Sequence, residues 1–234
     1  MTRIATVLAV PGLLGGAGLF YDGTGSPPRA AADPLSGGYV VEVGVAFPEA
    51  AVRAALPAGL APAPGFTGGI AVYGGDEGWA LSPLAMGYVW VDVAGADGAP
   101  SRFMVQGFAT EGRGGASPIP ADLAAFGETH ELGPDGHLSA TAWPDRGSAL
   151  DLEVRVDAAS CRDGLSPAGG RVLVEGPDGS LGVIHMPVIL DLCEAEALSA
   201  RIEAPSSHVL GPFEPERVIW AGVGTPLRWA MPEL

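Results

Sequence analysis

Glycine and proline are so frequent that they restrict this chain to short, turn-rich elements. The 234 residues include 36 glycines and 22 prolines, and glycine does not recur at every third position as it does in collagen. Glycine in an element interior costs conformational entropy and proline removes a backbone donor, so long helices are disfavoured. Because 47% of the residues are hydrophobic, the chain can still form a core, which excludes wholesale disorder. The composition therefore favours a folded, mostly β protein.

Segments of strand length recur between the glycine and proline clusters. Residues 39–47 predict a strand, and Pro48 and Glu49 begin a short helix that ends at Leu56, before Pro57. Two more short helices are predicted at 120–126 and 194–202, the second because Leu198 and Ile202 are four residues apart. The remaining predicted strands are 69–73, 87–93, 102–109, 127–132, 137–143, 149–156, 171–175, 181–192 and 218–221.

Three tetrapeptides carry the signature of tight turns between these strands. Residues 133–136 and 176–179 both read Gly-Pro-Asp-Gly, and residues 95–98 read Gly-Ala-Asp-Gly. Proline fixes φ and glycine accepts a positive φ, which suits hairpin turns. The sequence thus predicts three hairpins in a mostly antiparallel sheet of an α+β domain.

The charged residues exclude several classes of function. With 27 acidic residues against 12 basic ones, the net charge of −15 would repel phosphate backbones and anionic lipids. We therefore expect no nucleic-acid and no membrane partner. All twelve basic residues are arginine, so side-chain Schiff-base chemistry and a Walker lysine are excluded. The G-x-S-x-G, H-E-x-x-H and Walker patterns are also absent from the sequence.

The cysteines and the N-terminal segment bear on the compartment. Cys161 and Cys193 are too few and too far apart for a zinc ribbon or a disulfide framework, so we expect free thiols. Residues 4–10 are apolar and Ala30–Ala32 resembles a cleavage site, but glycines and Pro11 dilute the apolar segment. We expect a cytoplasmic protein with an N-terminal arm at 1–35; the alternative is export after cleavage near Ala32.

The strand at 86–93 supplies the best candidates for ligand contacts. Alternation puts Tyr88, Trp90 and Asp92 on one face and the valines on the other. The aromatic face either lines a ligand cavity or covers the outer surface. Gln106, an amide among apolar residues of the next strand, is either a third ligand contact or a hydrogen-bonded core residue.

Candidate catalytic residues follow in the next loop and hairpin. Glu111 and Arg113 could polarise a carbonyl or bind a carboxylate, or form an ordinary exposed ion pair. His130 and His137 straddle the first Gly-Pro-Asp-Gly turn and could share a proton, with Glu128 on the same face. Two imidazoles do not make a metal site, and we expect no metal and no cofactor. The isolated His185 and His208 are more typical of structural residues.

Three segments resemble the acetoacetate decarboxylase family. Residues 39–60, which contain a strand, a helix and the sequence Leu-Pro-x-Gly-Leu after the helix, are similar to the N-terminal part of that family's domain. Pro83–Val91 resembles the strand that lines the family's pocket. Residues 188–192, 211–213 and 226–227 resemble its closing strand and tail. The resemblance implies a curved closed antiparallel barrel or cone with short peripheral helices over residues 36–234, enclosing an apolar pocket.

The departures from that family determine the functional hypothesis. The family's pocket lysine forms an imine with a β-keto acid, which a chain without lysine cannot do. The family's pocket carboxylates are also not evident near Ser82 or Gly68. We therefore expect an enzyme, such as a lyase, hydratase, aldolase or cyclase, that acts on a carbonyl metabolite without an imine. The alternative is a non-catalytic binding protein for an apolar or keto-acid ligand, and either admits a homo-oligomer.

Overall fold

The computed structural model describes somewhat more than half of the chain. The described residues are 35–36, 39–74, 85–94, 100–109, 135–145, 148–160, 162–163, 171–175, 179–185, 188–189, 191–224 and 228–230. The predicted N-terminal arm lies outside them except for Leu35, as do the predicted helix at 120–126 and the strand at 127–132.

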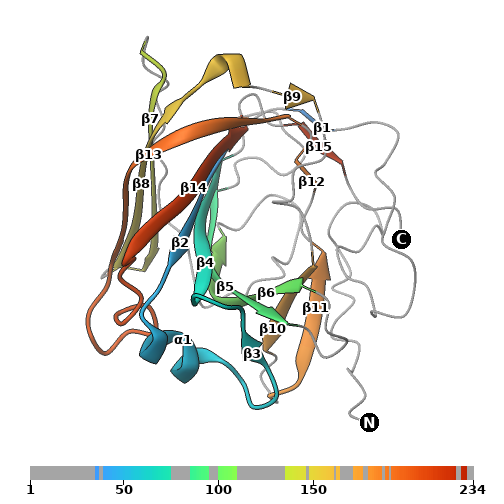
Figure 1. Cartoon of the computed structure of the whole chain (residues 1–234), viewed down its shortest axis with the longest axis vertical. Coiled ribbons are helices and arrows are strands. Elements are labelled where there is room, and N and C mark those ends of the chain that lie inside the picture. The colour runs from blue at the N-terminus through green and yellow to red at the C-terminus, as the bar shows by residue number, and fades with distance from the viewer. Residues whose placement is uncertain are drawn as a thin grey trace.

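One large sheet organises the described residues (Figure 1). Its strands follow the order β11-β10-β6-β5-β4-β2-β14-β13-β8-β7, and neighbours are antiparallel except for the parallel pair β10 and β6. The strands of this path are β2 (Tyr39–Ala46), β4 (Thr67–Gly74), β5 (Ala85–Ala94), β6 (Pro100–Ala109), β7 (His137–Asp145), β8 (Ser148–Val156), β10 (Arg171–Glu175), β11 (Leu181–His185), β13 (Asp191–Glu203) and β14 (Arg217–Gly224).

Short elements complete the fold. Strand β3 (Ala61–Pro62) pairs with β5, and β9 (Arg162–Asp163) pairs with β13. A second, three-stranded sheet has the order β1-β15-β12, formed by Leu35–Ser36, Arg228–Ala230 and Val188–Ile189. The one described α-helix, α1 (Glu49–Ala55), follows β2, and a 3₁₀ turn, η1, covers Ala158–Ser160.

The predicted mostly antiparallel fold is confirmed, but closure of the barrel is not observed. Among the described strands, the path of the large sheet ends at β11 on one side and at β7 on the other, without pairing between the two. The sheet curls instead, so that β4 and β5 face β7 and β8 across the core (Figure 1). A strong twist brings these layers together without hydrogen-bonded closure.

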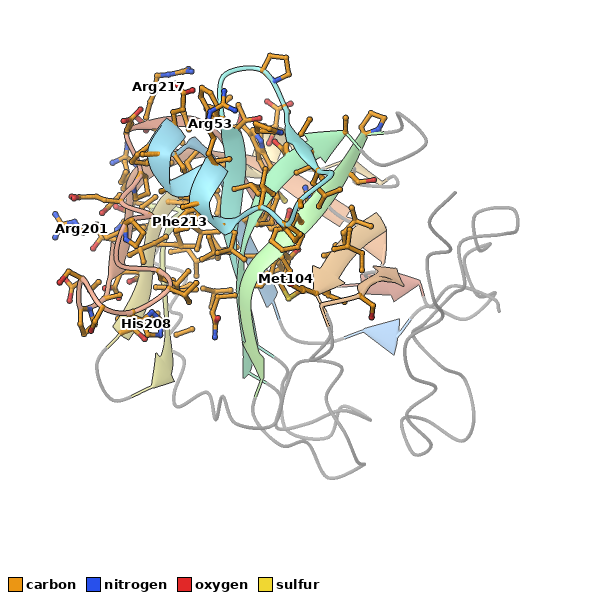
Figure 2. All side chains as sticks on the ribbon, turned by 90° about the horizontal axis from the view of Figure 1, so that it is seen from below. Arg53, Met104, Arg201, His208, Phe213 and Arg217 are labelled. Carbon is orange, nitrogen blue, oxygen red and sulfur yellow. The ribbon has the colours of Figure 1, made fainter. Side chains whose placement is uncertain are left out.

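The core lies inside this curl. Val41, Val43 and Val45 of β2 are fully buried and contact the apolar faces of the neighbouring strands, together with Val52 of α1. Phe213 lies beneath α1 with its ring 5.2 Å from that of Phe47, whereas Arg201, His208 and Arg217 lie at the periphery (Figure 2).

The predicted helix at 194–202 is wrong, because this segment is part of the long strand β13. Exposure alternates from Glu194 to Leu198, which is the period of two expected of a strand. The segment pairs with β8 over most of its length and with β14 at its start, and this pairing overrides a weak local preference for helix. Leu198 is on the exposed face of this alternation and falls at a register shift between Ala197 and Ser199. The predicted continuous strand at 181–192 is likewise divided into β11, β12 and the start of β13.

Two of the predicted hairpins are confirmed by strand pairing. Strands β5 and β6 pair antiparallel across residues 95–99, and β10 and β11 do so across 176–180. Gly179 has the predicted positive φ of 76°, and Gly136, at the start of β7, has a φ of 78°. The strand that would precede Gly136 lies outside the described residues, so that hairpin stays a prediction.

The expectation of free thiols is wrong for Cys193. This residue, at the start of β13, is buried and forms a disulfide bond. Cys161 lies outside the described residues.

Candidate functional site

A buried carboxylate marks the candidate site. Glu42 is in the middle of β2, and none of its surface reaches solvent. It belongs to the face of β2 opposite the core valines, and its register neighbours are Gly222 on β14 and Ala71 on β4. A charged group is almost never fully buried without partners, so this position needs a physical explanation.

Two polar side chains from the neighbouring strands approach Glu42. The Tyr88 hydroxyl on β5 donates a hydrogen bond of 3.2 Å to Glu42 Oε1. Sheet register produces this contact, because Glu42 pairs with Ala71 and Ala71 pairs with Tyr88 in one row across three strands. Arg102 Nη1 on β6 lies 3.8 Å from the same oxygen, within ion-pair range but beyond a hydrogen bond.

A second set of contacts holds the arginine and the tyrosine in place. The Arg102 guanidinium lies over the Trp90 ring, 4.2 Å from its centroid, in a cation–π arrangement. The Trp90 indole donates to Asp92 Oδ1 at 3.1 Å, and the Thr67 hydroxyl donates to Asp92 Oδ2 at 2.8 Å. The rings of Tyr88 and Trp90 are 5.3 Å apart. These polar contacts link the six residues that we call the Glu42 cluster: Glu42, Thr67, Tyr88, Trp90, Asp92 and Arg102.

Glycine makes room for the indole in this cluster. Gly69 on β4 is the register neighbour of Trp90, and an ideal Cβ on Gly69 would overlap the six-membered ring of Trp90. Any larger residue at position 69 would therefore displace the ring that carries Arg102. The local sequence Gly68-Gly69 thus fixes the position of Trp90 as well as the path of the strand.

The charges of the cluster suit acid–base or anion-binding chemistry. Glu42 is within ion-pair range of the Arg102 guanidinium, Asp92 is the register neighbour of Arg102, and only 14% of the Arg102 side chain is exposed. Electrostatic interactions are stronger in such a site than in water. The cluster therefore contains a carboxylate able to accept a proton, a phenol able to donate one and a cation able to bind an anionic group.

Three residues that the sequence placed on one face of a strand, Tyr88, Trp90 and Asp92, belong to this cluster. Tyr88 and Trp90 are both buried, so their face of β5 does not form the outer surface. Gln106 is elsewhere, because its register neighbour is Val89, on the opposite face of β5. Glu111, Arg113, His130 and Glu128 lie outside the described residues, as does the side chain of His185.

The other histidines have structural surroundings. His208 Nδ1 accepts the Leu210 backbone N–H at 3.1 Å, and His137 begins β7 opposite Arg155. In the described part of the chain, no group of three His, Cys, Asp or Glu residues is placed to hold a metal ion.

Glu42, Thr67 and Arg102 were missed by reasoning from the sequence. The signal for Glu42 was present, since it is the single acid in the run Val40-Val41-Glu42-Val43 within a strand that reads as buried. Arg102 gave no such signal, because its approach to Glu42 depends on the register of β5 and β6.

Among the described residues, no helix is long and apolar enough to cross a membrane.

Comparisons with known proteins gave matches only among solved structures. No protein-family model matches the sequence, and neither does any curated protein. One similar structure is the enduracididine biosynthesis enzyme MppR, in complex with the condensation product of pyruvate and imidazole 4-carboxaldehyde. Its sequence identity is 13%, the match covers 88% of this chain and 94% of that chain, and the TM-score is 0.53.

Two further similar structures are acetoacetate decarboxylases. One is 12% identical, with 92% of this chain and 90% of that chain covered and a TM-score of 0.49. The other, from Legionella pneumophila, is 11% identical, with 97% and 96% covered and a TM-score of 0.49. Apart from the closure of the barrel, the likeness to MppR confirms the predicted fold: the chain has an acetoacetate decarboxylase-like fold.

Proposed function

We propose that this protein is an enzyme that enolises a small keto acid without forming an imine. The observation that carries the proposal is the fully buried Glu42 carboxylate, which accepts a hydrogen bond from Tyr88 and is paired with Arg102. Burying an ion pair contributes little net stability, so a purely structural benefit is a weak reason to place one here. A carboxylate held between a phenol and a guanidinium is instead suited to moving a proton.

The absence of lysine determines the type of chemistry. Arginine stays protonated near neutral pH and is not a nucleophile, so no side chain of this protein can form an imine. We therefore assign the activation of the carbonyl to the hydrogen bonds and charge that the cluster offers.

In the proposed step, Glu42 removes a proton from the carbon next to the substrate carbonyl. The electron pair of the broken C–H bond forms the enolate double bond, and the carbonyl π electrons move to oxygen. Arg102 balances the negative charge on that oxygen or on the substrate carboxylate. Tyr88 donates a hydrogen bond to the substrate carboxylate or to the enolate oxygen. The enolate then takes back a proton from Glu42 or adds to a second carbonyl, and in this last case the new alkoxide takes the proton that Glu42 holds.

The choice of a keto acid rests on the charge of the cluster. Arg102 offers planar donors that match a carboxylate, and its stacking on Trp90 holds the plane of the guanidinium. The ligand named for MppR, which shares the fold, also derives from a keto acid. We further propose that Glu111, Arg113 and His130 contribute ligand contacts or proton transfers, whereas Gln106 faces away from the cluster.

Proton exchange in D₂O tests this proposal directly. Pyruvate, acetoacetate and larger keto acids are incubated with the protein, and loss of the α-proton signal is followed by NMR. We expect exchange above the buffer rate with the native protein and a loss of at least about a hundredfold in the Glu42→Gln variant. Borohydride added to the mixture is expected to trap no adduct on a side chain.

Matched controls come from exposed ion pairs elsewhere in the chain. Glu49→Gln breaks the pair of Glu49 with Arg53, and Arg155→Gln breaks the pair of Arg155 with Glu196, all four side chains being at least half exposed. Both control variants should exchange protons at the native rate, whereas Arg102→Gln should be slowed. Equal activity of Glu42→Gln and Glu49→Gln would contradict the proposal.

A binding protein is the second candidate, and the closure of the cluster favours it. Glu42 and Tyr88 are inaccessible to solvent. In a binding protein, the sole role of these two residues would be to position Arg102 as an anion receptor. Binding of keto acids without proton exchange would support this candidate.

A further inference from the structure

Trp220 lies on the sheet face that carries the Glu42 cluster, and it has no role in the proposed proton transfer. Trp220 on β14 is 38% exposed, which is unusual for an indole in a folded protein. Its ring is nevertheless fixed, because an ideal Cβ on Gly44 of β2 would overlap Nε1 and Cδ1 of the indole. The five-membered ring therefore occupies the space where residue 44 would have a side chain, and other parts of the indole remain accessible.

A β-bulge directs Trp220 to this face. Val218 pairs with Val45 and Trp220 pairs with Gly44, so Ile219 is an extra residue without a partner in the register. In a regular register without this bulge, Trp220 would pair with Val43 and would share the face of Val218 and Val45. Bulges often serve to redirect a side chain beside an active site.

The face that receives Trp220 is the one that carries Glu42. Gly44 is two residues beyond Glu42 on β2 and pairs with Gly69 on β4, above which Trp90 lies. The two indoles thus occupy adjacent glycines, and Trp90 in turn supports Arg102. Along this row, exposure rises from 0% at Glu42 and 1% at Trp90 to 38% at Trp220, so the row leads from the buried cluster to solvent.

We propose that Trp220 is a stacking platform for a planar aromatic ring on the substrate. This inference rests on the proposed function, since it assumes that the carboxylate end of the substrate lies at Arg102 and its carbonyl carbon near Glu42. Two residues of strand span about 7 Å, so the aromatic ring must be joined to the keto acid through a short linker. The substrate class is therefore a keto acid that carries an aromatic or heteroaromatic ring a few bonds from its carboxylate.

The competing explanation for the exposed indole is an interface between copies of the chain. Val218, Ile219 and Leu198 are also exposed, and together with Trp220 they could form an apolar contact surface. The bulge argues against this explanation, because it separates Trp220 from Val218 and turns the indole toward the face of the Glu42 cluster.

The test compares ring-bearing and ring-free keto acids on matched variants. Binding of phenylpyruvate and of pyruvate is measured by calorimetry for the native protein, Trp220→Ala, Gly44→Ala and the control Leu198→Ala, which removes a similarly exposed apolar side chain. We expect Trp220→Ala to weaken phenylpyruvate binding about tenfold and to leave pyruvate binding unchanged. Gly44→Ala, whose new methyl group displaces the indole, should have the same selective effect, and Leu198→Ala should have none.

Three outcomes would overturn the inference. They are equal binding of both acids by the native protein, parallel loss of both in Trp220→Ala, and a dimer in solution that dissociates in Trp220→Ala and in Leu198→Ala alike. The proposed function fails separately: tight, Trp220-dependent binding of phenylpyruvate without proton exchange keeps the platform and rejects the enzyme. Proton exchange without any preference for the ring keeps the enzyme and rejects the platform.

Discussion

The disulfide bond of Cys193 allows a quantitative test of stability. Strands β9 and β13 pair antiparallel, with Asp163 opposite Asp191 and Arg162 opposite Leu192. Cys193 directly follows Leu192 in the sequence, and residue 161, which directly precedes Arg162, is the only other cysteine of the chain. We therefore predict a Cys161–Cys193 bridge and a loss of stability in Cys193→Ser.

The expected magnitude follows from the loop that the bridge closes. A loop of about 32 residues removes enough entropy from the unfolded chain to stabilise the folded state by about 3.7 kcal/mol at 25 °C. For a chain of this size such a loss lowers the melting temperature by roughly 10 °C.

Thermal unfolding followed by circular dichroism, with and without dithiothreitol, checks this prediction. The reductant should lower the melting temperature of the native protein to that of Cys193→Ser and should not affect the variant. Two free thiols in the denatured, unreduced protein, or equal melting temperatures of native protein and variant without reductant, would refute the reasoning. Disulfides persist in oxidising compartments, so a confirmed bridge would favour the export alternative over the expected cytoplasmic location.

The packing of the sheet supports three further predictions. Gly69→Ala should destabilise the fold by about 1–3 kcal/mol in urea titrations and change the near-UV circular dichroism, because its methyl group overlaps the Trp90 ring; an unchanged aromatic spectrum would contradict the placement of that ring. Phe213→Ala should cost about 3–5 kcal/mol in the same titrations, since the ring is buried against Phe47; a loss below about 1 kcal/mol would place Phe213 outside the core. Arg155→Gln should change stability by less than about 0.5 kcal/mol, because its ion pair is exposed, and a larger loss would show that the pair is structural.

The elements that the sequence predicted well are those whose signals are local. Strand β2 and helix α1 are bounded by proline and have strong apolar patterns, so their ends were placed within one or two residues. The hairpins at 95–99 and 176–180 follow from turn chemistry in the same way. Strand β13 shows the opposite case: its spacing of Leu198 and Ile202 fits a helix, and only the pairing with β8 makes it a strand.

The candidate site depends on non-local register, which explains why half of it was missed. Tyr88 and Trp90 were recognisable because alternation along a single strand separates them from the valines. The contacts of Glu42 with Tyr88 and Arg102 join three strands, and a shift of one residue in any of them would turn the side chains apart. The position of Trp220 depends in addition on the bulge at Ile219, which no local pattern announces.

The abundance of glycine limits the chain to short elements, and it also makes room for aromatic rings on the sheet face that carries the Glu42 cluster. At Gly44 and Gly69 the missing side chain is replaced by an indole from the neighbouring strand. In this way a thin part of the sheet accommodates two large rings, one buried beneath Arg102 and one open to solvent. Glycine in a strand interior weakens the strand, so these positions lower stability unless the packing of the rings compensates for the loss. The same exchange places a cation and an aromatic surface beside a buried carboxylate, which is the combination that a ring-bearing keto acid requires.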